Sequence, residues 1–134
     1  MQILMAEAGP TEEIGPAFDR MVKENAQGLL GTAGNGAQSR VEIVKQAARV
    51  RLPAVYTDER YVEAGGLVSY GTDNVDLVRR GAVYVDKILR GAKPADLPVE
   101  EPTNYRMVLN LKTAKALNIK VSQSMLIRAD QVIE

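Results

Sequence analysis

Cysteine and histidine are both absent from the 134 residues of this chain. Without them the chain can form no disulfide, no thiol nucleophile, no Cys/His zinc site and no Ser-His-Asp triad. Phosphate-binding motifs are missing too, because neither G-K-[ST] nor the G-x-G-x-x-G spacing occurs. The sequence therefore predicts a protein that is not an enzyme and that uses no metal and no cofactor.

The chain also lacks a surplus of charge of either sign, since 17 Lys and Arg residues balance 17 Asp and Glu residues. Nucleic-acid binders need extra basic side chains to neutralise phosphates, so no nucleic-acid partner is predicted. No apolar run approaches the roughly 20 residues that cross a bilayer, which excludes direct membrane insertion. The segment Met1–Ala8 is short and has no basic start, so we expect no export signal within this chain.

Apolar stretches alternate with helical patterns along the whole chain. The predicted strands are Gln2–Ala6, Gln27–Thr32, Leu52–Tyr56, Leu67–Tyr70 and Tyr105–Leu111. Short strands that alternate with helices are typical of βαβ units. The sequence thus predicts a single α/β lobe over residues 1–134, with a mainly parallel sheet flanked by helices.

Three helix starts can be read from local signals. A helix is expected from about Pro16, because proline is tolerated in a first turn. The capping-box pattern at Ser39 and Glu42 opens a second helix, whose inner side should hold Val41, Val44 and Ala48. The third and longest helix is expected after Asp73, a preferred N-cap residue. Shorter helical segments are expected at about Lys112–Leu117 and, capped by Ser122 or Ser124, through Ala129.

Four stretches of the second half carry a family resemblance. They are YVEAGGLVSYG at 61–71, YVDKILRGAKPADLPVE at 84–100, NLKTAKAL at 110–117 and RADQVIE at 128–134. Their order and spacing closely resemble the C-terminal region of bacterial ABC-transporter substrate-binding proteins of the tryptophan/tyrosine-uptake type.

This resemblance implies the C-terminal lobe of a type I periplasmic binding protein, in which two α/β lobes joined by a hinge hold the ligand between them. It implies that residues 67–92 form a strand and helix that cross the hinge to an N-terminal lobe. It further implies capture of a small molecule, such as an amino acid or a related compound, for an ABC permease in a periplasmic or extracytoplasmic space. The alternative reading is the effector-binding lobe of a cytoplasmic regulator with the same fold.

Ligands of open α/β sheets bind at the carboxyl ends of the strands, and three strand exits supply candidate contacts. The candidate ligand-binding residues are Asn35, Tyr56, Ser69, Tyr70 and Asp73. Three of them have a structural interpretation as well: Asn35 lies in a Gly-rich loop, Tyr56 could be a partly buried strand end, and Asp73 could serve only as a helix cap. The carboxylates of Asp58, Glu59 and Glu63 are expected on a solvated surface.

The helix after Asp73 carries an apolar stripe formed by Val75, Val78, Ala82, Val85 and Leu89. The family resemblance implies that this stripe packs on a lobe that the chain does not contain. Exposed apolar patches of this kind mark association surfaces. We therefore expect either that the helix folds back on its own lobe or, as the favoured outcome, that a homodimer forms through the Val75-Val78-Val85-Leu89 stripe.

Overall fold

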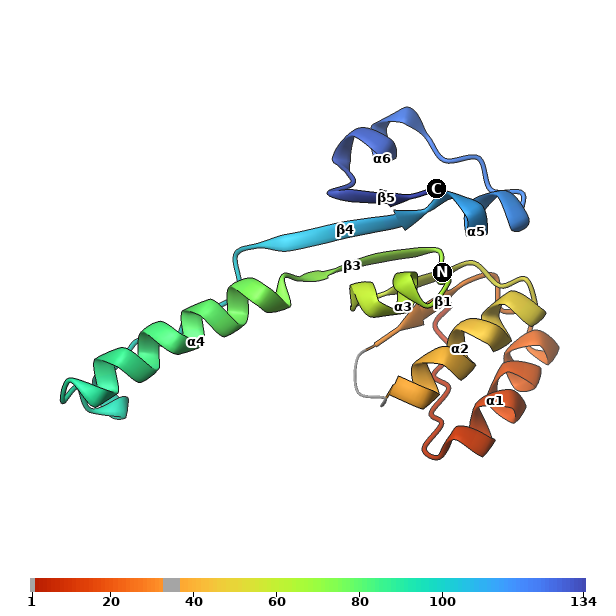
Figure 1. Cartoon of the computed structure of the whole chain (residues 1–134). Helices are drawn as coiled ribbons and strands as arrows, with labels where there is room; N and C mark the ends of the chain where they lie inside the picture. Colours follow the sequence, from red (N-terminus) through yellow and green to blue (C-terminus); the bar gives the residue numbers. More distant parts are fainter. Residues whose placement is uncertain (1, 33–36) are drawn as a thin grey trace.

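The computed structural model describes residues 2–32 and 37–134 (Figure 1). Within these residues, five strands form one sheet with the order β1-β2-β3-β4-β5. The strands are β1 Leu29–Gly31, β2 Ala54–Tyr56, β3 Val68–Thr72, β4 Tyr105–Asn110 and β5 Gln131–Ile133. The helices are α1 Thr11–Lys23, α2 Ala37–Arg49, α3 Glu59–Glu63, α4 Asn74–Leu89, α5 Leu111–Ala116 and α6 Gln123–Arg128, with a 3₁₀ turn at Pro94–Asp96.

The sheet is mostly parallel. Strands β1, β2 and β3 run in the same direction, β4 is antiparallel to β3, and β5 is parallel to β4. Figure 1 shows α1, α2 and α3 gathered beside β1, with α5 and α6 beside β5. This arrangement confirms the predicted α/β fold of a mainly parallel sheet flanked by helices.

Two hydrophobic clusters hold the helices on the sheet. The first joins Ile14 and Phe18 of α1 and Val44 of α2 to Ala54 and Tyr56 of β2. The second surrounds Leu67, Val68, Leu109 and Ala114, and Leu126 of α6 packs against it. Successive strand residues point to opposite faces, so Val55 lies on the other side of the sheet from Ala54 and Tyr56 and is 41% exposed.

Two N-terminal predictions are wrong. Gln2–Ala6 forms no strand, and the side chains of Ile3 and Met5 are more than three-quarters exposed. An apolar run becomes a strand only where a neighbouring strand takes up its backbone hydrogen bonds, and none of the described residues does so here.

Helix α1 begins at Thr11, ahead of Pro16, which lies inside the helix. Buried Ile14 and Phe18 on either side of the proline hold the helix on the sheet.

The predicted start of α2 is also wrong, because the helix begins at Ala37 and Ser39 falls inside its first turn. The hydroxyl of Ser39 instead lies 3.2 Å from that of Thr11. The buried face of α2 carries Val44 and Ala47, whereas Val41, assigned to the inner side, is 58% exposed. Ala48, also assigned to the inner side, is exposed as well. The sequence pattern missed α3 and β5 because each is very short.

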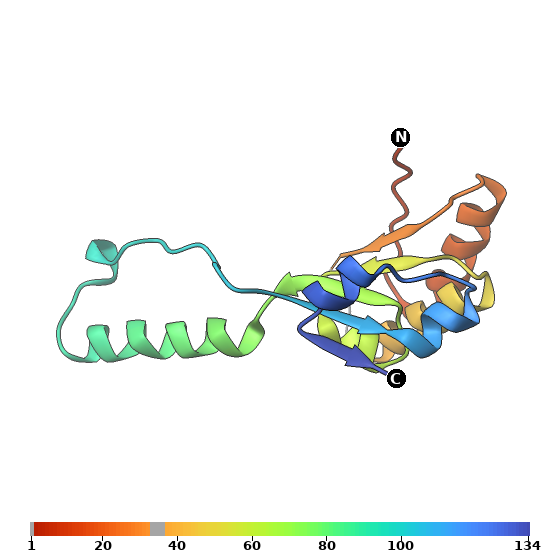
Figure 2. The ribbon, with the colours of Figure 1, turned by 90° about the horizontal axis from the view of Figure 1, so that it is seen from above.

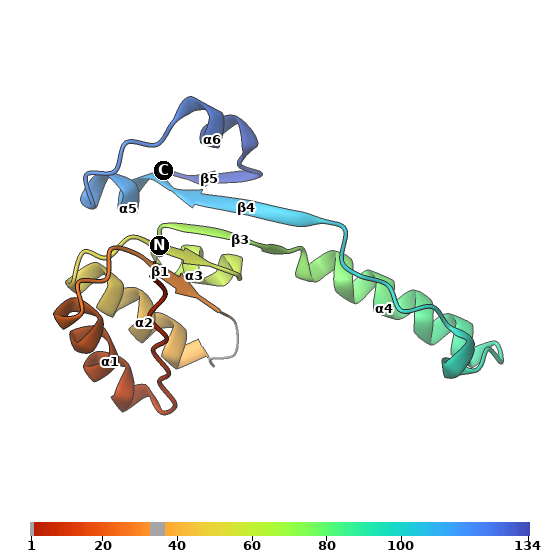
Figure 3. The same ribbon diagram turned by 180° about the vertical axis from the view of Figure 1, so that it is seen from behind.

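Helix α4 projects away from the rest of the molecule, and the return segment to β4 runs back along it (Figures 2 and 3). None of the residues of α4 is buried by its described neighbours. Asp73 caps the helix as predicted, since its carboxylate accepts from the backbone N–H of Val75 at 2.9 Å and of Asp76 at 3.1 Å. The helix therefore forms without the help of a hydrophobic core.

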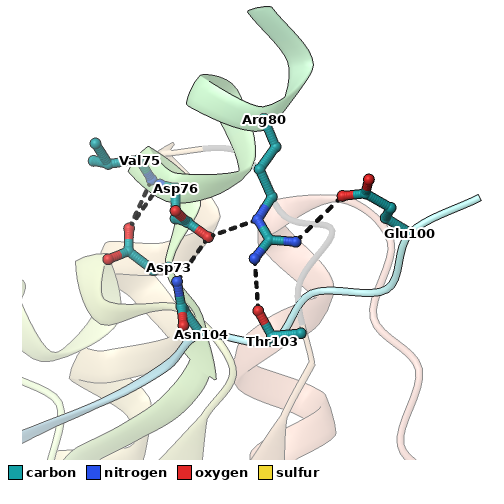
Figure 4. Close-up of polar contacts among 7 residues, drawn as sticks. All are labelled: Asp73, Val75, Asp76, Arg80, Glu100, Thr103 and Asn104. Carbon is teal, nitrogen blue, oxygen red and sulfur yellow. Dashed lines mark hydrogen bonds and ion pairs between the residues drawn. The ribbon is translucent and has the colours of Figure 1, made fainter. Parts of the chain in front are cut away.

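The base of this arm is tied together by the guanidinium of Arg80 (Figure 4). Its Nε donates to Asp76 at 3.1 Å and its Nη2 to the hydroxyl of Thr103 at 2.6 Å. Its Nη1 lies 3.4 Å from Glu100. The amide of Asn104 donates to the same oxygen of Asp76 at 2.9 Å. These bonds fix the return segment to the first turns of α4.

Among the described glycines, Gly71 has the least room for a side chain, so its substitution should cost the most stability. A Cβ atom at Gly71 would lie 1.9 Å from the carbonyl oxygen of Thr57, so Gly71→Ala should lower the free energy of unfolding by at least about 3 kcal/mol. Gly81→Ala is the matched control: no described atom lies within 4 Å of the added Cβ, and alanine should stabilise α4 by about 0.5–1 kcal/mol. Urea denaturation measures both, and equal effects of the two substitutions would contradict the close packing of β3 on the loop after β2.

Candidate ligand-binding site

The carboxyl ends of β1, β2 and β3 meet at one edge of the sheet, because these strands are parallel. Helices α2 and α3 begin directly after β1 and β2, so their N-termini lie at this same edge. The hydroxyls of Thr11 and Ser39, 3.2 Å apart, show that α1 begins there as well. Three helix N-termini, each with the positive end of its dipole, thus converge on this edge. The edge is electrostatically suited to an anionic group such as a carboxylate.

Two of the predicted ligand residues are neighbours in the sheet. Tyr56 and Ser69 are register partners on β2 and β3, so their side chains point to the same face. Both side chains are at most 1% exposed, and neither hydroxyl has a hydrogen-bond partner among the described residues. The ring of Tyr56 stacks on that of Tyr61, with 4.6 Å between centroids. Burial, with a smaller contribution from Tyr61, raises the pKa of Tyr56 to about 12.

The other predicted residues lie apart from this pair. Tyr70 follows Ser69 in β3 and therefore points to the opposite face, where it is 52% exposed and stacks on Tyr105 at 5.7 Å. Asp73 lies beyond the end of β3 and uses one carboxylate oxygen to cap α4. Asn35 lies outside the described residues. The structure therefore brings together Tyr56 and Ser69, and it separates them from Tyr70 and Asp73.

Of the acidic residues after β2, Glu63 is exposed as the sequence suggested, whereas Asp58 is buried and Glu59 is half-buried. Asp58 is 8% exposed, caps α3 through the backbone N–H of Arg60 at 2.9 Å, and forms an ion pair with the guanidinium of Arg60. The Arg60 guanidinium also donates hydrogen bonds to the Asp58 carboxylate, and these hold the pKa of Asp58 below its usual value. Burial acts in the opposite direction and raises this pKa. Glu59 accepts from Arg106 of β4 at 2.8 Å. The partner Arg106 lies 47 residues away, which hid this pair from sequence analysis.

One residue at this edge was missed entirely. Arg40 lies in the first turn of α2, and its guanidinium carbon is 5.8 Å from the centroid of the Tyr61 ring. A cation in a first turn is opposed by the helix dipole, so its position needs another favourable interaction. The Tyr61 ring and the nearby carboxylate of Asp58 both attract the guanidinium of Arg40 and so offset part of this unfavourable effect. A basic residue shortly after a strand exit was the sequence signal that could have identified Arg40.

The described residues hold no group of three or more acidic side chains arranged to bind a metal ion. Within the same part of the chain, every helix is too short or too polar to cross a bilayer.

Comparisons with known proteins agree with this architecture. The family model described as ABC transporter substrate binding protein matches residues 1–133, and the chain belongs to that family. Among solved structures, an ABC domain from Streptococcus pneumoniae in complex with L-Trp has 30% identity and a TM-score of 0.82, covering 94% of this chain and 44% of that one. A conserved domain protein from Vibrio cholerae has 24% identity and a TM-score of 0.84, covering 93% of this chain and 42% of that one.

Among curated proteins, an uncharacterized protein of Rickettsia prowazekii, RP367, is 26% identical over 99 residues, which are 73% of this chain and 33% of the relative. The chain thus spans a third to less than half of the length of these proteins.

The burial of Tyr56 predicts that the free energy of unfolding depends measurably on pH above pH 10. Its pKa of about 12 lies above the value of 10.0 for an exposed phenol, so the unfolded chain loses this proton first as the pH rises. The contribution of the neutral phenol to stability is complete below pH 10 and is lost as the pH approaches 12. In urea denaturation at stepped pH, Tyr56→Phe should lose less stability than the native chain across this interval. Tyr70→Phe, which removes a half-exposed hydroxyl, should behave like the native chain. Coincident curves for Tyr56→Phe and the native chain would contradict the burial of this hydroxyl.

Proposed function

We propose that this chain forms one wall of a cleft that captures a small solute, an amino acid or a related compound, for an ABC permease in an extracytoplasmic compartment. Two lobes would close about a hinge and so enclose the solute, with no catalytic step. Ligand contacts that exist only in the closed state would drive this closure. The observation that carries the proposal is the convergence of three helix N-termini at the carboxyl edge of β1, β2 and β3.

The residues at this edge suit the two charged groups of an amino acid. The helix N-termini and Arg40 favour a carboxylate, and Asp73 offers a carboxylate to an ammonium group. Ser69 contributes a buried hydroxyl that the described residues leave without a partner, and such a group gains most from a new hydrogen bond. Tyr56 points to the same face as Ser69. Tyr70, which points to the opposite face of β3, and Asn35, which lies outside the described residues, are further proposed contacts. The family membership and the L-Trp complex of the pneumococcal neighbour support this ligand class.

The solute test uses Ser69→Ala. A titration of the chain with L-Trp and other amino acids, followed by the NMR chemical shifts of backbone amides, should shift signals around Ser69. The lost hydrogen bond should weaken binding by about 0.5–3 kcal/mol, which raises the dissociation constant about two- to 140-fold. Ser124→Ala, on exposed α6, is the matched control and should bind as the native chain does. Equal affinities of all three proteins would remove Ser69 from the site.

Residues 67–92 are proposed to form the hinge-crossing strand and helix. Strand β3 leads through Gly71 and Asp73 directly into α4, and the molecule narrows at this point (Figure 2). The apolar stripe of α4 is left exposed: Val75 is 55%, Val78 74%, Val85 56% and Leu89 82% exposed. In longer relatives the stripe would face the other lobe, and in this chain it would pair with a second copy.

Sedimentation velocity at several concentrations tests the pairing. The chain should sediment as a dimer at micromolar concentration, and Val85→Asp should shift it to the monomer because a carboxylate is costly to bury in an apolar contact. Val99→Asp is the matched control, since Val99 is 99% exposed and lies off the stripe. A native chain that stays monomeric at all concentrations would show that the stripe needs no second copy.

A further inference from the structure

A second hollow lies at the amino-terminal ends of β2 and β3, at the opposite end of the sheet from Ser69 and Asp73. It has a volume of about 370 Å³ and lies between the C-terminal end of α2 and α5. Leu52 and Leu67, the residues that lead into β2 and β3, and Leu117 after α5 give it apolar walls. This volume is in the range of sites that hold small molecules. We refer to it as the amino-edge groove.

The charged side chains that line the amino-edge groove are all positive. Arg51 and Lys112 line it, and no aspartate or glutamate is among its lining residues in the described part of the chain. The charges of the whole chain balance, so two cations without an acid in one hollow are a local excess. Opposite charge on an occupant would complement the excess and favour its binding.

The backbone holds Arg51 in a specific and uncommon conformation. Its φ is +54°, the left-handed region that a residue with a side chain rarely adopts. The side chain then reaches α5, where Nη2 donates to the carbonyl oxygen of Ala116 at 3.0 Å. This bond uses one of the five N–H groups of the guanidinium. Arg51 is therefore anchored beside the groove and still has donors for an anion.

We propose that the amino-edge groove binds a small amphipathic carboxylate. The apolar walls would take up a short hydrocarbon chain, and Arg51 and Lys112 would bind the carboxylate at the rim. The groove opens at the other end of the sheet from the carboxyl edge, and the ring of Tyr56 lies at its inner side. The proposal does not depend on the proposed solute-capture function. A bound molecule would bridge α2 and α5, which pack on the two different hydrophobic clusters.

Octanoate is the probe, and octanol is its uncharged counterpart of equal length. Titration of the ¹⁵N-labelled chain with octanoate should shift the amide signals of Ala48, Leu67 and Thr113, which line the groove, and leave those of Asp73 and Val75 unchanged. Octanol should bind at least fivefold more weakly. Octanoate binding should also weaken with added salt, because the carboxylate is bound partly by charge.

Three variants locate the site. Lys112→Met and Arg51→Asn should each weaken octanoate binding at least threefold and leave octanol binding unchanged; asparagine tolerates the left-handed backbone. Ala116→Phe, which fills the groove, should abolish binding of both probes. Lys115→Met, on α5 but outside the lining residues, is the matched control and should bind octanoate normally. Amide spectra of the unliganded variants establish that each is folded.

Three results would overturn the proposal. The first is the absence of shifts with octanoate up to millimolar concentration. The second is equal binding of octanoate and octanol together with no effect of Lys112→Met, which would indicate a merely apolar hollow. The third is binding of a blocked Glu-Leu-Glu peptide in the groove without binding of octanoate, which would assign the groove to an acidic protein segment.

Discussion

The ring of Tyr56 occupies space that exists only because two neighbours have no side chain. A Cβ atom on Gly31 would lie 2.7 Å from Cδ1 of this ring, and one on Gly66 would lie 2.6 Å from Cε2. Tyr61 of α3 stacks against the ring within the same cluster. One side chain therefore fixes the position of β1, of the turn before β3, and of α3 relative to β2. Because side chains in protein interiors are closely packed, a change in this ring should also disturb the neighbours that it contacts in the first cluster.

This packing also gives the two ends of the sheet different chemistry. The ring of Tyr56 fills the space beside Gly66, so the first cluster stays apolar between the two ends. At the carboxyl edge, the close approach of Gly71 to Thr57 brings the end of β3 against the loop that ends at Asp58, just before Glu59 and Arg60 of α3. Charged pairs and helix N-termini meet there, whereas the amino edge has an apolar hollow with a cationic rim. The two ends of one small sheet therefore present different chemical groups.

The sequence predicted the fold class and the central elements because their signals are local. Asp73 before a long amphipathic pattern predicted α4 and its cap, and the alternation in 105–111 predicted β4. Elements that depend on distant neighbours were not predictable. The apolar run at 2–6 reads as a strand but has no strand to pair with among the described residues, and β5 forms only because β4 offers it an edge. The same limit applies to the site, where the proximity of Tyr56 to Ser69 follows from strand register, and the Glu59–Arg106 pair from packing across the sheet.

Helix α4 combines an ordered backbone with an exposed apolar stripe. Local interactions stabilise the arm: the Asp73 cap fixes its start, ion pairs of Asp76 with Arg80 and of Asp86 with Arg90 lie along it, and Arg80 also ties down the return segment. None of these interactions uses the apolar stripe, which remains exposed. Because the helix is already ordered, a partner that covers the stripe does not have to supply the conformational entropy of forming it. The polar contacts of the arm therefore hold its shape while its apolar stripe stays exposed.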